Sequence, residues 1–261
     1  MNIKRYGFTA ALAGLMLSGA VHAVPILPGN ETSLDKLFNA TVDATGNGWI
    51  KTGTRLDVNG AEQKTSAAWE ITGSSGSFSR IIIEIAGNAA YNSFGIYDVL
   101  NPGNKLELFS GAAGAGSTQT TVESNGFSFT AGANSATFGS SIFGYYLATG
   151  SSGGLGPVFY SNSALNSGTD QMVAFQGDDL RKVNFFGLGS NKTWKSTEWV
   201  LAWEDIVYAN SDKDFNDFVV VVESVDPATP VPEPATLALL GMGLLGLGAK
   251  RRQKKAAELA V

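Results

Sequence analysis

The sequence contains no cysteine and a single histidine in 261 residues. Without cysteine, the chain has no disulfides, thiolate metal sites or cysteine nucleophiles. One histidine nearly excludes a Ser-His-Asp triad and a metal site with several histidine ligands. Charge is also scarce, because charged residues are 16% of the chain and the net charge of −5 offers no basic surface for nucleic acid. Glycine is abundant at 32 residues, and this composition favours an exported β-rich protein.

The first 23 residues have the three parts of a secretory signal peptide. Lys4 and Arg5 supply positive charge, residues 7–20 form an apolar run, and small residues precede a cleavage point after Ala23. We expect the export machinery and signal peptidase to act on this segment. The alternative is an uncleaved anchor, but the run is shorter than the about 20 residues of a membrane span. Since His22 leaves with the segment, we expect a mature chain without histidine.

The C-terminal end predicts a second membrane-directed segment. Residues 226–234 (DPATPVPEP) include four prolines and predict an extended spacer. Residues 235–249 have no charge, and they precede a basic cluster of Lys250, Arg251, Arg252, Lys254 and Lys255. We expect residues 235–255 to form a transmembrane anchor helix with its basic end in the cytoplasm, followed by a tail at 256–261. The alternative is a buried core helix.

The order of these features resembles the PEP-CTERM sorting signal of Gram-negative bacteria. The resemblance rests on Pro232, Glu233 and Pro234, on the Gly/Leu-rich run, and on the membrane stop Lys250, Arg251 and Arg252. It implies that an exosortase, a membrane transpeptidase-like protease, recognises the motif. It also implies a transient inner-membrane anchor, then a place at the cell surface or in the extracellular matrix, with an association to exopolysaccharide and biofilm.

The segment between the two ends, residues 24–225, predicts an all-β domain. A short helix is expected at 33–39, because Leu34, Leu37 and Phe38 would share one face after a capping serine or threonine. Short apolar runs between Gly/Ser/Asn loops predict strands elsewhere. One hairpin is expected to turn at residues 101–104 (NPGN), a sequence typical of a type II turn. Together these features predict a single, jelly-roll-like β-sandwich.

Acidic residues gather between two apolar runs near the end of this domain. Residues 199–203 and 218–222 should be paired strands, so that residues 204–217, with five acids and one lysine, form the hairpin loop. Crowded carboxylates are costly unless a cation relieves them, and Ca²⁺ prefers oxygen ligands. An EF-hand is excluded, because residue 217 is not glycine and a strand follows it. We predict a different calcium loop, with ligands from Asp212, Asp214, Asn216 and Asp217 and from Glu204 or Asp205. The alternative is a solvated acidic turn.

The same region resembles domain-of-unknown-function family 4114. The resemblance rests on residues 203–205 (WED), on residues 212–217 (DKDFND) and on the valine run that follows. Residues 69–72, 84–87, 94–98 and 171–177 are similar to members that end in a PEP-CTERM tail. The family occurs on secreted bacterial proteins, often beside calcium-binding or adhesive modules, and it implies no enzyme activity.

We therefore expect an exported structural or adhesive protein, not an enzyme, with a calcium-stabilised acidic hairpin. One alternative is a carbohydrate-binding module that uses exposed aromatic side chains. Its candidates are Trp49, Trp69, Trp194, Trp199, Trp203, Tyr145 and Tyr146. Aromatic residues that alternate along strands are more often core residues. A second alternative is a polysaccharide hydrolase that uses paired carboxylates, although the sequence fixes no pair at the separation such an enzyme needs.

Overall fold

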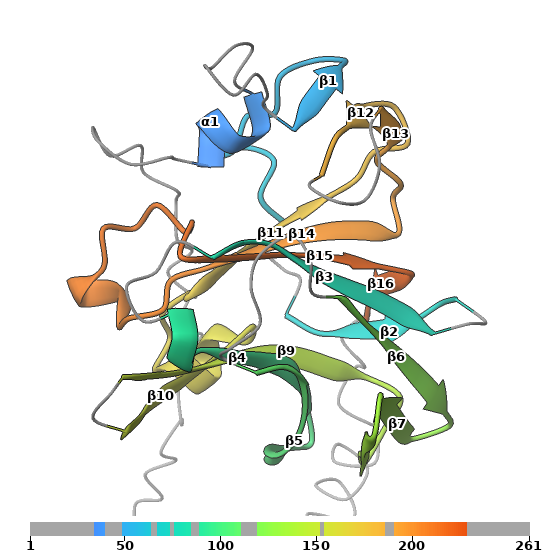
Figure 1. Cartoon of the computed structure of the whole chain (residues 1–261), viewed down its shortest axis with the longest axis vertical. Coiled ribbons are helices and arrows are strands. Elements are labelled where there is room, and N and C mark those ends of the chain that lie inside the picture. The colour runs from blue at the N-terminus through green and yellow to red at the C-terminus, as the bar shows by residue number, and fades with distance from the viewer. Residues whose placement is uncertain are drawn as a thin grey trace, which may run out of the picture.

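A computed structural model describes residues 34–39, 49–63, 67–73, 76–84, 89–110, 119–151, 154–185 and 191–228 (Figure 1). The signal peptide, its cleavage point at Ala23, the sorting motif, the anchor and the basic stop lie outside the described residues. Within the described ranges, no helix is long and apolar enough to cross a bilayer.

Three antiparallel sheets make up most of the described chain, which confirms that the protein is mostly β. A seven-stranded sheet has the order β11-β14-β15-β3-β6-β7-β8. Its strands are β3 (Ser77–Glu84), β6 (Gln119–Asn125), β7 (Ser128–Ala131), β8 (Asn134–Thr137), β11 (Met172–Gln176), β14 (Glu198–Trp203) and β15 (Phe218–Glu223).

A six-stranded sheet has the order β16-β2-β9-β4-β5, and β10 pairs with β9. Its strands are β2 (Trp69–Ile71), β4 (Ser93–Asp98), β5 (Asn101–Phe109), β9 (Phe143–Ser151), β10 (Gly154–Tyr160) and β16 (Val225–Pro227). A small third sheet joins β1 (Ile50–Thr52), β12 (Lys182–Val183) and β13 (Lys192–Thr193). The predicted helix is present as α1 (Leu34–Asn39). Three 3₁₀ helices complete the elements, namely η1 (Ala89–Tyr91), η2 (Ser163–Asn166) and η3 (Tyr208–Asn210).

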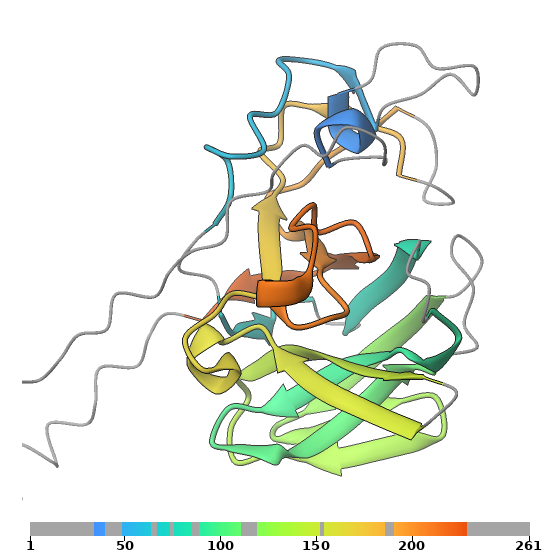
Figure 2. The same ribbon diagram turned by 90° about the vertical axis from the view of Figure 1, so that its left-hand side faces the viewer.

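The seven-stranded sheet is the middle layer. Figures 1 and 2 show the six-stranded sheet on one side of it, and α1 with the small sheet on the other. Trp199, Leu201 and Trp203 of β14 lie in a hydrophobic cluster shared with the six-stranded sheet. Val200 and Ala202, which alternate with them, lie in a second cluster with α1 and the small sheet. Because successive side chains of a strand face opposite sides, β14 is buried on both faces.

The predicted hairpin at residues 93–109 is present, but its predicted turn is wrong. Asp98 pairs with Asn101, so Val99 and Leu100 form the turn and residues 101–104 belong to β5. The Asp98 carboxylate explains the shift, because its oxygens accept hydrogen bonds from the N–H groups of Leu100, at 2.9 Å, and Gly139, at 2.8 Å. Because β5 is an edge strand, the proline at 102 is tolerated.

The second cluster and the small sheet were not predicted from the sequence. The small sheet is built from strands of two or three residues, which are too short to show a pattern. The finer prediction of a single jelly-roll-like sandwich stays a prediction. Every side chain of β14 is buried between the layers, so this strand gives rigid support to the acidic loop that follows it.

Candidate metal site in the acidic loop

The acidic loop connects β14 to β15, as the sequence predicts. The two strands pair antiparallel over six residues, and the last pair joins Trp203 to Phe218. All six residues of β14 and five of the six residues of β15 are buried. Burial of each large apolar side chain stabilises the fold by about 1.5–3 kcal/mol, and this stabilisation fixes the register of the two strands. The ends of the loop are therefore held at a constant separation, while residues 204–217 extend beyond the sheet.

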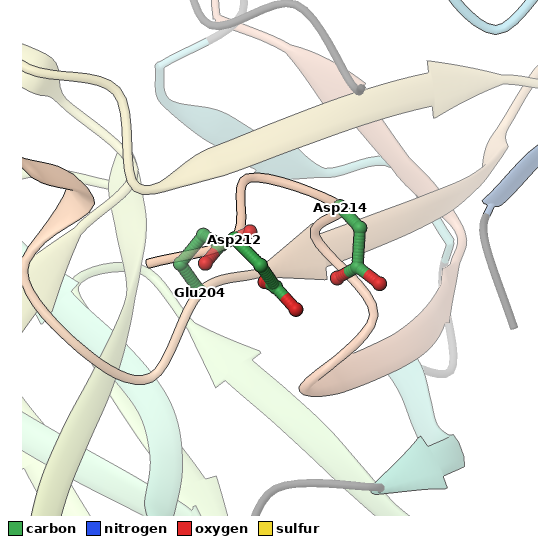
Figure 3. Close-up of side chains that lie close together, drawn as sticks. All are labelled: Glu204, Asp212 and Asp214. Carbon is green, nitrogen blue, oxygen red and sulfur yellow. The ribbon is translucent and has the colours of Figure 1, made fainter. Parts of the chain in front are cut away.

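Three carboxylates of this loop lie together (Figure 3). Glu204, Asp212 and Asp214 each offer one oxygen, and these oxygens lie within 4.8 Å of one another. Glu204 directly follows β14, whereas the other two come from the returning half of the loop. Glu204 and Asp214 are fully buried, with 0% of their surface exposed, and Asp212 is exposed. The cluster therefore has a buried floor and an opening to solvent at Asp212.

The backbone on either side of Asp214 bends the loop around this cluster. Lys213 and Phe215 have positive φ angles of 67° and 54°, in the left-handed region that non-glycine residues rarely adopt. The Phe215 N–H donates to Glu204 Oε1 at 2.7 Å, and the Asn216 N–H donates to Asp214 Oδ1 at 3.2 Å. Asn216 Nδ2 also donates to Asp214 Oδ2. These bonds fix both buried carboxylates, while the strained backbone stores an unfavourable energy of about 1–3 kcal/mol per residue.

The charge of the cluster is not balanced within the loop. Lys213 is the loop's basic residue, and its ammonium lies over the Tyr208 ring, 5.0 Å from the centroid. Burial raises the pKa of the Glu204 carboxyl above its ordinary value, although the Ser211 hydroxyl lowers it, and the charge of Asp212 raises it further. Glu204 Oε2 is buried and accepts no hydrogen bond of normal geometry from the described residues. A buried carboxylate oxygen without a donor is unfavourable unless a cation binds it.

The other two predicted ligands form a separate pair. Asp205 accepts a hydrogen bond at Oδ2 from Asn92 Nδ2, at 3.0 Å, and its own N–H donates to Asp217 Oδ2, also at 3.0 Å. Burial raises the pKa of Asp217 to about 7, and the charges of Asp205 and Glu204 contribute to the increase. The structure thus brings Glu204, Asp212 and Asp214 together, with Asn216 bonded to Asp214. It places Asp205 against Asn92, and Asp217 against the Asp205 N–H.

The arrangement of the three carboxylates suits a hard divalent cation. Two oxygens bound to one Ca²⁺ at about 2.4 Å lie at most about 4.8 Å apart. The separation of the clustered oxygens falls within that limit. Calcium accepts six to eight oxygens in irregular geometry, so backbone carbonyls and water entering beside Asp212 can complete its shell. Zinc is a poor fit, because its structural sites use cysteine and histidine ligands, which the cluster lacks.

Sequence reasoning missed Asn92, which comes from the segment between η1 and β4. It is 113 residues from Asp205 in the chain, and no local pattern around it indicates the contact. The aromatic candidates for sugar binding are core residues instead. Each of them is at most 7% exposed, namely Trp49, Trp69, Trp194, Trp199, Trp203, Tyr145 and Tyr146.

Comparison with known protein families gives two matches along the chain. Residues 119–225 match the family described as "Domain of unknown function (DUF4114)". This range includes β6 to β15 and therefore the whole acidic loop. Residues 230–252 match the PEP-CTERM protein-sorting motif. Neither a curated protein nor a solved structure matches the chain.

Proposed function

We propose that this chain, which combines a DUF4114 domain with a PEP-CTERM sorting motif, is a structural or adhesive protein with a calcium-stabilised acidic loop. The sorting motif implies an exported protein that an exosortase processes and that is sorted to the cell surface. The proposed place of action is the cell surface or the extracellular matrix, in contact with exopolysaccharide. The proposed role is not catalytic.

The observation that supports calcium best is the buried side chain of Glu204. Its Oε2 accepts no normal hydrogen bond from the described residues. One oxygen of the Glu204 carboxylate lies within 4.8 Å of an oxygen of Asp212 and of Asp214. A solvated acidic turn, the alternative interpretation, would expose its carboxylates to water. Here Glu204 and Asp214 are both 0% exposed, and Asp212 is the exposed member of the cluster. A bound cation would balance the charge that burial concentrates.

Thermal unfolding of the full chain in detergent, with calcium or with chelator, tests this proposal. A cation that binds only the folded state at 100 times its Kd stabilises that state by about 2.7 kcal/mol. For a domain of this size the Tm should rise by about 5–10 °C. Asp212→Asn is the informative variant, because Asp212 is exposed and its loss should weaken calcium binding without harming the core.

The control is Glu123→Gln, which removes an exposed acid of β6 outside the loop. It should respond to calcium as the unmodified chain does. Titration calorimetry should give one calcium per chain, weakened at least tenfold in Asp212→Asn. Equal Tm values in calcium and in chelator would disprove the calcium site and leave the sorting function untouched.

The carbohydrate-binding alternative receives no support from the tryptophans. All five are at most 7% exposed, so none offers a flat face to a sugar ring. Among the described residues, the exposed aromatic side chains are Tyr91 and Phe127, at 48% and 54%. They come from η1, which lies between β3 and β4, and from the turn between β6 and β7. We therefore keep the structural or adhesive role as the proposed function.

A further inference from the structure

The domain holds its own C-terminal end in a sheet. β16 pairs antiparallel with β2, so that Val225 faces Ile71 and Pro227 faces Trp69. The Ala228 N–H then donates to the Ala68 carbonyl at 2.9 Å. Val225 and Trp69 are 0% exposed, which ties this pairing to the hydrophobic core. The chain is therefore part of the folded domain as far as Ala228, the third residue of the segment predicted as spacer.

Very little chain separates this fixed point from the sorting motif. Three residues, 229–231, lie between Ala228 and Pro232, and the apolar run begins at Ala235. A fully extended chain covers at most about 3.6 Å per residue. Pro232 is thus within about 14 Å of Ala228, and Ala235 is within about 25 Å. The distance is set by covalent geometry, whatever conformation these residues adopt.

This short reach constrains how a membrane enzyme can approach the motif. When the apolar run is inserted in the bilayer, the headgroup layer takes about 6 Å of this maximum distance, which leaves at most about 20 Å between the folded domain and the bilayer. A small domain is about 30 Å across, so no folded domain of the enzyme fits between the bilayer and the substrate domain. An enzyme that binds the motif as an extended chain also covers the residues before it, and these residues soon enter β16.

The edge where the chain leaves the domain is also acidic. Asp226 of β16 lies directly opposite Glu70 of β2, and like charges at such a pair weaken strand pairing. Anionic lipid headgroups attract lysine and arginine, whereas Asp226 and Glu70 are both acidic. The exit edge, which we define as Ala68, Glu70, Asp226 and Ala228, is therefore a poor lipid contact.

We infer that the exit edge faces the exosortase during sorting, and that the β16–β2 pairing restricts the enzyme's access to the Pro-Glu-Pro motif. Release of β16, favoured by the repulsion between Asp226 and Glu70, lengthens the accessible chain before the motif. The folded domain thereby sets the rate of its own processing. This inference rests on the sorting motif and is independent of the calcium site.

The test is pulse-chase processing of the full chain in a bacterial host that has an exosortase. Ten Gly/Ser residues inserted between Ala228 and Thr229 should shorten the half-time of processing at least threefold, because they separate the motif from the sheet. The same ten residues inserted after Gly132, an exposed position in the β7–β8 turn, should leave the half-time unchanged. An unchanged or longer half-time with the insertion at Ala228 would overturn the inference.

A second variant tests the β16 pairing without lengthening the chain. Glu70 is exposed, and Glu70→Lys places an opposite charge across from Asp226, which strengthens the pair. Processing should slow about twofold, while the Tm of the domain stays equal or rises. A rate equal to or faster than that of the unmodified chain would overturn the role given to β16. The unmodified chain, measured alongside, reports separately whether the sorting motif is processed at all.

Discussion

Replacing Glu204 with glutamine should raise the stability of the calcium-free protein. Glutamine has nearly the same shape as glutamate and keeps an oxygen for the Phe215 N–H, which now donates to Glu204 Oε1 at 2.7 Å. The substitution removes a buried charge whose second oxygen accepts no normal hydrogen bond from the described residues. It therefore separates the electrostatic cost of this carboxylate from its packing.

The size of the effect follows from the burial of Glu204. A buried acceptor that is left without a hydrogen bond, as Glu204 Oε2 is, costs about 1–3 kcal/mol, so Glu204→Gln should be that much more stable in chelator. At about 2–4 °C per kcal/mol, the Tm should rise by about 2–12 °C. In calcium the advantage should shrink or reverse. If the lost carboxylate weakens calcium binding about 100-fold, the unmodified chain gains about 2.7 kcal/mol more from saturating calcium than the variant does.

The assay is differential scanning calorimetry of both chains, with and without calcium, beside the exposed-site control Glu123→Gln. The Tm difference between Glu204→Gln and the unmodified chain should change when calcium is added. A variant that is less stable than the unmodified chain in chelator would show that the charge of Glu204 is not unfavourable in the fold. A calcium response of equal size in both chains would show that Glu204 is not a ligand.

Three further predictions concern pH, an ion pair and a close contact. Burial raises the pKa of Asp217 from 3.8 to about 7, so in chelator the folded state should lose stability as the pH rises between these values, and Asp217→Asn should flatten that part of a Tm–pH profile. Lys192 bonds Glu198 at 2.8 Å and Glu223 at 2.7 Å, so Lys192→Met should cost about 1–3 kcal/mol in urea unfolding. Gly144→Ala should cost about 1–3 kcal/mol by the same measurement, because its new Cβ would lie 2.3 Å from the Tyr97 ring.

The hairpin and its acidic loop could be predicted because both signals are local. Two apolar runs that flank a run of acids specify a pair of strands and a charged connection. The division of the acids into two groups could not be predicted in the same way. Glu204 and Asp205 are neighbours in the sequence, yet the first joins Asp212 and Asp214 while the second bonds Asn92. That outcome depends on where the six-stranded sheet packs.

The turn after β4 shows a second limit of sequence reasoning. The Pro-Gly pair at 102–103 is a common turn signal, but the Asp98 carboxylate closes the turn earlier by bonding the Leu100 and Gly139 N–H groups. Gly139 is 41 residues away, so this competing interaction is invisible to local propensity. The two-residue strand β13 escapes detection for the related reason that its pairing with β12 alone defines it.

Burial of β14 and β15 on both faces has a consequence for unfolding. Val219 and Val221 face α1 and the small sheet, while Phe218, Val220 and Val222 face the six-stranded sheet. The β14–β15 hairpin thus belongs to both hydrophobic clusters. Unfolding either cluster would expose one face of this hairpin to water. We expect the whole described domain to unfold as one cooperative unit, in which the small sheet is as indispensable as the larger layers.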